Sequence, residues 1–129
     1  MKKLTVGEVM TQAPHTIGED RTLSDAHEMM QKYKIRHLPV LKRAKLVGIL
    51  TDRDLNLVET FNDVDPKTVR VKEAMALDPY VVAKTQSVAE VAKGMADSKV
   101  GSAIVWEKER VIGIFTTVDA CRVLAKALA

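Results

Sequence analysis

Apolar residues at helical spacing predict a long helix early in the chain. Leu23 and Ala26 are three positions apart, Met30 continues the same face, and Tyr33 or Met29 extends it. The Thr-Leu-Ser-Asp stretch that leads into these positions is a capping-box pattern, in which each end residue bonds to the backbone of the other. We therefore expect a helix that begins here and buries one apolar face.

The following residues predict a hairpin and a second helix. Apolar runs over residues 35–41 and 46–50 flank a polar turn at residues 42–45, which is typical of two antiparallel strands. A helix is expected from residue 52 toward residue 59. Upstream, a proline favours extended backbone before it, so residues 15–17 are expected to form a short strand.

The whole pattern returns 65 residues later, without a gap, from about residue 2 to residue 58. Chance does not keep such a register over so many positions, so the chain contains an internal repeat. We expect one repeat over residues 1–61, a linker over residues 62–67 and a second repeat over residues 68–129. In the second repeat, Ser87 and Glu90 are expected to form the better capping box. The identical pairs include Val6 and Val71, Glu8 and Glu73, Met10 and Met75, Pro14 and Pro79, Met30 and Met95, and Val40 and Val105.

Each repeat is predicted to contain strand, helix, strand, strand and helix, preceded by a short helical lead-in. A unit of about 60 residues is marginally stable alone, because its fraction of buried surface is small. We therefore expect an α+β fold in which two βαββα repeats pack sheet to sheet around a pseudo-twofold axis.

Composition excludes several classes of protein. Apolar residues make up 47% of the chain and charged residues 29%, which is ordinary for a soluble globular protein. The formal net charge is only +3, whereas nucleic-acid-binding domains usually carry a clustered basic excess. No apolar run is long enough to span a bilayer and no secretory signal is present, so we expect no membrane contact. The single cysteine, Cys121, cannot form an intrachain disulfide, which is consistent with the cytoplasm, and we expect it to be a packing residue.

The stretch Gly-Ile-x-Thr-x-x-Asp occurs at residues 48–54 and again at residues 113–119. Each copy follows an apolar run and precedes a helical pattern, so it is predicted to be a strand-to-helix junction. Thr51 and Thr116 are expected to be N-caps, with an aspartate at the third helical position. The junction can simply cap its helix. It can also bind an anion, because a helix N-terminus presents free backbone N–H groups.

The paired repeats resemble a tandem CBS domain pair, or Bateman module, from Val6 to about Val123. The resemblance rests on Val-Gly-Glu-Val-Met at residues 6–10, on Ile-Arg-His-Leu-Pro-Val at residues 35–40 and on the duplicated junction. It implies a regulatory module with an adenine nucleotide in the cleft between its repeats. Thr51 and Thr116 would then contact phosphate, and Asp54 and Asp119 would accept the ribose hydroxyls.

The same resemblance implies that the short first strands recognise the adenine edge through their backbone, while two isoleucines line the ring. Plain core packing is an alternative explanation for these apolar residues. AMP, ADP, ATP or another adenosyl compound are the candidate ligands, and no cofactor is expected to be required. The residues concerned are His15, Thr16 and Ile17 in the first repeat, Tyr80, Val81 and Val82 in the second, and the isoleucines Ile49 and Ile114.

Basic residues distinguish the two repeats. Arg36 and His37 begin the predicted second strand of the first repeat, where an arginine can bind phosphate oxygens with two parallel hydrogen bonds. The alternative is an exposed basic pair on a strand edge. Arg53 lies in the first junction. The corresponding residues of the second repeat are small or neutral, so unequal ligand affinities are expected; they are Gly101, Ser102 and Val118.

No set of residues suitable for catalysis is evident, and the three histidines lack the spacing of a metal site, so we expect neither an enzyme nor a metal protein. The resemblance implies a homodimer that acts on a separate effector protein. The alternative is an interaction or assembly module that binds no ligand. Binding of nucleic acid through the basic turn at residues 42–45 is disfavoured by the acidic residues elsewhere.

Overall fold

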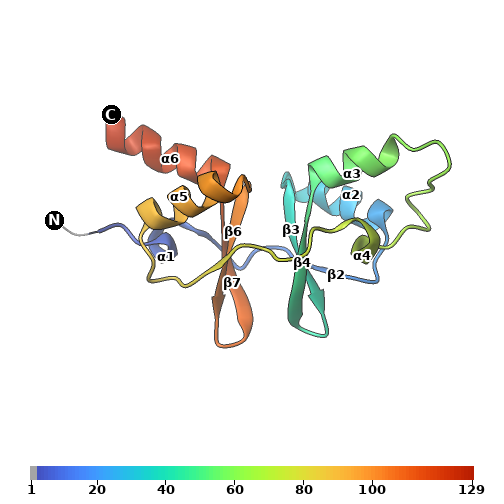
Figure 1. Cartoon of the computed structure of the whole chain (residues 1–129), viewed down its shortest axis with the longest axis horizontal. Coiled ribbons are helices and arrows are strands. Elements are labelled where there is room, and N and C mark those ends of the chain that lie inside the picture. The colour runs from blue at the N-terminus through green and yellow to red at the C-terminus, as the bar shows by residue number, and fades with distance from the viewer. Residues whose placement is uncertain (1–2) are drawn as a thin grey trace. The chain divides into compact units, whose positions relative to one another are not determined.

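The computed structural model describes residues 3–129 and shows an α+β fold with two separate sheets. Its contacts divide the chain into two compact units. The first unit is His15–Pro79, and the second contains Tyr80–Ala129 together with the described residues of Met1–Pro14. The elements, drawn in Figure 1, are α1 (Val6–Val9), β1 (Thr11–Gln12), β2 (Ile17–Gly18), α2 (Leu23–Tyr33), β3 (His37–Lys42), β4 (Lys45–Thr51), α3 (Asp52–Glu59), α4 (Val71–Ala74), β5 (Val81–Val82), α5 (Val88–Ser98), β6 (Ser102–Glu107), β7 (Arg110–Thr116) and α6 (Thr117–Leu128).

The sheet of the first unit has the strand order β2-β3-β4, with β2 parallel and β4 antiparallel to β3. The β3–β4 hairpin turns through Arg43 and Ala44, whose φ values of 49° and 69° suit the type I′ turn of a two-residue loop. Helices α2 and α3 pack beside this hairpin (Figure 1). They enclose a core that includes Leu38 and Leu50, both fully buried.

The sheet of the second unit has the order β1-β7-β6-β5 and repeats the same hairpin. Strand β1 was not predicted. It forms because Thr11 and Gln12 pair with Ile114 and Gly113 of β7. In the first unit the equivalent contact is a single bridge between Ile49 and Ala76. The core of the second unit surrounds Phe115.

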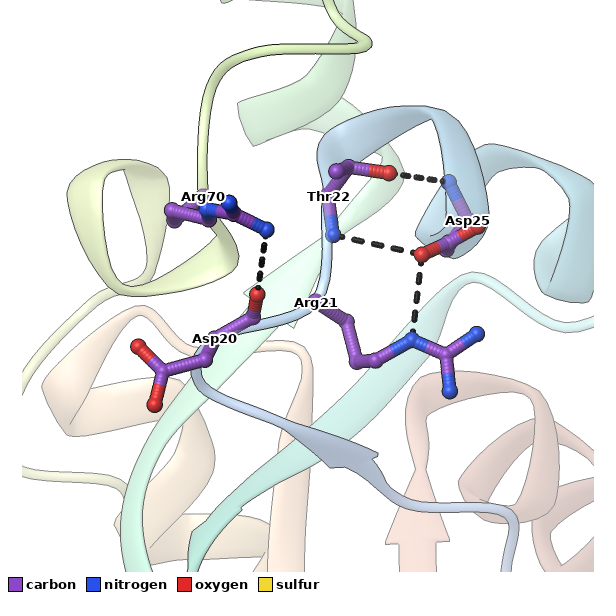
Figure 2. A network of polar contacts seen from close by, with 5 residues as sticks. All are labelled: Asp20, Arg21, Thr22, Asp25 and Arg70. Atoms are coloured by element: carbon purple, nitrogen blue, oxygen red, sulfur yellow. Dashed lines mark hydrogen bonds and ion pairs between the residues drawn. The ribbon is translucent and has the colours of Figure 1, made fainter.

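Each sequence repeat begins with a short helical lead-in, α1 in the first repeat and α4 in the second. Each lead-in lies in the compact unit that contains the hairpin of the other repeat. In the first unit, Val71 donates its backbone N–H to the carbonyl of Arg21 at 2.8 Å. Figure 2 shows Arg70 donating from Nη1 to the carbonyl of Asp20 at 2.9 Å. Beside this contact, Thr22 and Asp25 form the predicted capping box. A hydrogen bond from Arg21 lowers the pKa of the Asp25 carboxyl group.

Gly48, the first residue of the repeated stretch, is required by the docking of a lead-in. A Cβ atom at this position would lie 2.7 Å from Sδ of Met75 and 2.8 Å from the carbonyl oxygen of Ala76. In the second unit Met10 contacts Gly113 in the same way. The repeated glycine therefore lets a methionine from the lead-in lie against the strand, which sequence reasoning did not anticipate.

We predict that Gly48→Ala lowers the free energy of unfolding by about 1–3 kcal/mol, because the added methyl group overpacks this contact. Gly18→Ala is the matched control: the nearest atom to its added Cβ is Cγ of Arg21, at 3.7 Å. That variant should change stability by no more than about 0.5 kcal/mol in the same urea titration. Equal losses in the two variants would contradict this explanation of Gly48.

The structure corrects four expectations of detail. Ser87 accepts a hydrogen bond from the N–H of Glu90, but the Glu90 side chain does not complete the box, so the better boxes are those of Thr22 and of the two junctions. Met29, and not Tyr33, packs on the core. Strand β2 begins at Ile17 instead of residue 15. Cys121 is exposed on α6 and is no packing residue.

Within the described residues, no helix is long and apolar enough to cross a membrane.

Candidate functional site

The first junction, Thr51 to Asp54, is a complete capping box at the start of α3. The Asp54 N–H donates to Oγ1 of Thr51 at 3.2 Å. The Thr51 N–H and hydroxyl both donate to Oδ2 of Asp54, at 3.0 and 2.9 Å. The threonine hydroxyl proton is therefore engaged, and a phosphate can receive it only by displacing Asp54.

The backbone donors of this junction are mostly satisfied. The Asp52 N–H donates to the carbonyl of Arg36 at 3.0 Å, and those of Thr51 and Asp54 are used in the capping box. Among the described residues, the N–H of Arg53 has no such partner, which leaves it available to an anion at the positive end of the helix dipole. The junction thus offers one free backbone donor, fewer than expected from a helix N-terminus.

Strand register brings the other candidates of the first repeat to the same end of the sheet. His37 lies opposite Thr51 across the hairpin. Because Ile17 pairs with Val40 in parallel register, His15, two residues earlier, lies at the end of β2 that is beside the start of β3. The side chains of Arg36 and Arg53 are exposed at this end. The nine ligand-binding residues predicted in the first repeat thus lie in one unit, and most of them lie at one end of its sheet.

Burial lowers the pKa of His37, and the nearby guanidinium of Arg36 acts in the same direction. The carboxylates of Asp52 and Asp54 oppose the shift, but they do not overcome it. His37 is therefore a neutral imidazole near neutral pH. The positive charge of the first junction comes from its arginines.

His15 forms an aromatic stack that was not predicted. Its ring lies over that of Tyr33, with 3.6 Å between the centroids and 14° between the planes. The ammonium group of Lys32 lies 5.3 Å from the centroid of the tyrosine ring. Helical spacing predicts Tyr33, or Met29 in its place, on the core face of α2, but Tyr33 stacks on His15 instead. The stack lies at the surface, since His15 is exposed and Tyr33 is 39% exposed.

The second junction, Thr116 to Asp119, has the same capping box, and Ser102 lies opposite Thr116. Asp119 is buried, and its Oδ1 accepts from Nη1 of Arg122 at 3.4 Å. Sequence reasoning missed Arg122, although it follows Asp119 by three positions on the same helix face. The second junction is therefore less neutral than predicted, and both carboxylate oxygens of Asp119 are already engaged.

The apolar candidates separate into core residues and exposed residues. The side chains of Ile17 and Val82 belong to the two cores, so only their backbones remain available to a ligand. Val81 is 43% exposed. Tyr80 lies against Gly94 of α5, where a Cβ atom would collide with the phenol ring. Its carbonyl accepts from the N–H of Ile104 at 2.8 Å, so this backbone group is not free.

Other candidate features lie apart from the junctions. A hollow of about 310 Å³ at the opposite end of β3 is lined by Gly18–Arg21 and Leu41–Arg43. Its charged residues include Lys42 and Glu19, which are 3.9 Å apart. Among residues 3–129, no group of three or more histidine, cysteine, aspartate or glutamate side chains is arranged to hold a metal ion.

Comparison with known proteins identifies similar chains. The CBS domain model matches residues 6–58 and 71–126. Hypoxic response protein 1 of Mycobacterium tuberculosis is 30% identical over 119 residues, which are 92% of this chain and 83% of that protein. A hexameric CBS-CP12 protein from bloom-forming cyanobacteria is 34% identical, with a TM-score of 0.85 over 94% of this chain and 72% of that one. The CBS domain pair of protein MJ0100, solved with 5'-methylthioadenosine and S-adenosyl-L-methionine, is 25% identical, with a TM-score of 0.84 over 93% of this chain and 98% of that one.

Proposed function

Because the chain belongs to the CBS domain family, whose model covers both of its repeats, we propose that it is a regulatory module that binds an adenine nucleotide or a related adenosyl ligand. The observation that carries the proposal is the first junction. There Asp54 keeps Oδ1 free of hydrogen bonds from the described residues, beside the free N–H and exposed guanidinium of Arg53. The related MJ0100 pair was solved with two adenosyl compounds.

Each residue of the first junction has a chemical role in this proposal. Asp54 accepts from the ribose hydroxyls through Oδ1, and Arg36 and Arg53 bind phosphate oxygens. His37, a neutral imidazole, donates one hydrogen bond beside them. The backbone near Ile17 contacts the adenine edge, and the His15–Tyr33 stack supports this end of β2.

Binding can be coupled to a signal through the capping box. A phosphate that takes the Thr51 hydroxyl must replace a 2.9 Å hydrogen bond to Asp54, so the ligand changes how α3 begins. A ligand shifts a conformational equilibrium only by its difference in affinity for the two states. We propose that the states differ in self-association or in contacts with a separate effector protein, with a cytoplasmic homodimer as the basic assembly. No catalytic step is required.

The second junction is proposed to bind more weakly. Gly101 and Ser102 replace the basic pair, Val118 replaces Arg53, and Arg122 already occupies the carboxylate of Asp119. Thr116 and the backbone of Val81 remain as potential contacts, whereas the side chain of Ile114 is buried.

Isothermal titration calorimetry tests the proposal directly. Purified protein should bind at least one of AMP, ADP, ATP, NAD and S-adenosyl-L-methionine, with one site stronger than the other. If none of these compounds produces a saturable signal and the protein still self-associates, the alternative is favoured: an interaction or assembly module that binds no ligand.

We predict that binding of a phosphate-bearing ligand at the first junction strengthens as the pH falls from about 8 to about 6. Burial holds the pKa of His37 below its ordinary value, and an adjacent phosphate raises it, so the complex binds a proton between the two pKa values. His37→Gln should remove the part of this dependence that comes from the imidazole when affinity is measured by calorimetry across that range. The phosphate itself titrates at about 6 in both proteins, so the difference between the two pH profiles reports His37. His27→Gln is the histidine control, because His27 contacts Glu59, the last residue of α3, at 3.2 Å and is not a proposed ligand contact. An unchanged pH profile in the His37 variant would exclude this role.

A further inference from the structure

We propose that residues 4–12, the lead-in that completes the second unit, are exchanged between two copies of this chain. Each second unit of the resulting dimer is completed by the lead-in of the other copy. This inference does not rest on ligand binding and goes beyond it, because it concerns how the copies associate.

The groups that bind the lead-in all belong to the second unit. Val6 donates its N–H to the carbonyl of Gln86 at 2.8 Å, and Gly7 donates to that of Lys84 at 2.9 Å. Val6 is fully buried in the core, and Met10 lies against Gly113. The lead-in of a second copy carries the same groups in the same order, so it satisfies every one of these contacts.

The hinge after the lead-in is strained in the closed chain. Ala13 has a φ of 45°, in the left-handed region, and it directly precedes Pro14. An L-residue with a Cβ atom is unfavourable there, and a residue before proline prefers extended backbone. If the lead-in crosses to another copy, the hinge can extend and Ala13 leaves this conformation. Short hinges under strain favour such exchange.

The second lead-in provides an internal comparison. Asp78 occupies the equivalent hinge position before Pro79 and has a φ of 57°. Aspartate tolerates the left-handed region because its short polar side chain can bond locally. The costlier hinge is therefore the one at Ala13.

A pair of opposed residues makes the exchange detectable. Thr5 lies opposite Ser87 in an antiparallel bridge. On either side of this bridge, the Val88 N–H donates to the carbonyl of Leu4 and the Val6 N–H donates to the carbonyl of Gln86. Thr5 and Ser87 are therefore a non-hydrogen-bonded pair. The Cα atoms of such a pair are about 4.5 Å apart, within the range that a disulfide can span.

The experiment uses two full-length chains, one carrying Thr5→Cys and the other Ser87→Cys, both with Cys121→Ser. They are mixed in denaturant, refolded together at about 1 mM, where exchange competes with the effective concentration of the chain's own lead-in, and oxidised with glutathione disulfide. We expect a disulfide-linked heterodimer on non-reducing electrophoresis. Its yield should fall at least about fivefold with Ala13→Gly, which relieves the strain in the closed chain, and rise with Ala13→Val. Asp78→Gly is the matched control and should leave the yield unchanged.

A single chain that carries both Thr5→Cys and Ser87→Cys shows whether the closed form links as the geometry requires. The proposal is overturned if this chain forms its internal disulfide while the mixture gives no heterodimer. It is equally overturned if the heterodimer yield does not respond to Ala13→Gly and Ala13→Val.

Discussion

Phe115→Ala should lower the free energy of unfolding by about 3–5 kcal/mol, the usual cost of deleting a large buried aromatic side chain. Phe115 is 0% exposed and packs among Val82, Val91 and Val105 in the core of the second unit. The cost combines the lost transfer free energy of the ring with the cavity that it leaves. Urea denaturation followed by the fluorescence of Trp106, the single tryptophan, measures this loss in the second unit itself.

Phe61 is the matched control, because it is the only other phenylalanine and is 56% exposed. Phe61→Ala should change the free energy of unfolding by no more than about 0.5 kcal/mol. If the two substitutions were equally costly, burial of Phe115 could not be the source of the stability.

Local signals in the sequence were sufficient for the long helices and for most of their caps, with the Ser87–Glu90 box as the exception. Helix α3 begins and ends where predicted, and Thr51 and Thr116 are the N-caps with aspartate at the third position. These features depend on neighbouring residues, so a short stretch of chain determines them. The repeat then extended these predictions to the second copy, and the family model confirms the two repeats.

Features that depend on distant residues were not predictable in the same way. Strand β1 exists only because two residues of the lead-in reach β7, about 100 positions later. Gly48 appeared to belong to the junction, but its contact with Met75 is what excludes a side chain. Neither pairing leaves a periodic signal in the sequence.

The candidate site also contains features that neighbouring residues determine and features that distant residues determine. A regular hairpin over the predicted strands would pair His37 with Leu50. A β-bulge between Val40 and Leu41 shifts the register, so His37 lies opposite Thr51 instead. The stack of His15 on Tyr33 and the contact of Arg122 with Asp119 depend on side-chain directions at helix ends, which spacing alone does not fix. The predicted asymmetry between the junctions therefore has a second cause, the engagement of Asp119 by Arg122.

That second cause determines the expected effects of two further substitutions. Asp54→Ala should weaken the binding of an adenosyl ligand by about tenfold or more, since it removes an acceptor whose Oδ1 is free for the ribose. Asp119→Ala should have a smaller effect, because Arg122 already contacts Oδ1 of that carboxylate at 3.4 Å. Calorimetry with the tightest-binding ligand of the panel measures both.

Each of these aspartates also caps its helix, so the loss of a cap must be separated from the loss of a ligand contact. Asp25 separates them, since it closes the same box with Thr22 at the start of α2, where no ligand contact is proposed. Asp25→Ala should cost about 1 kcal/mol of stability, as the other two should, and leave ligand affinity unchanged. If Asp25→Ala weakened binding as much as Asp54→Ala, the first junction would act only as a helix cap. Negligible effects of both Asp54→Ala and Asp119→Ala would remove the aspartates from the ribose-binding role.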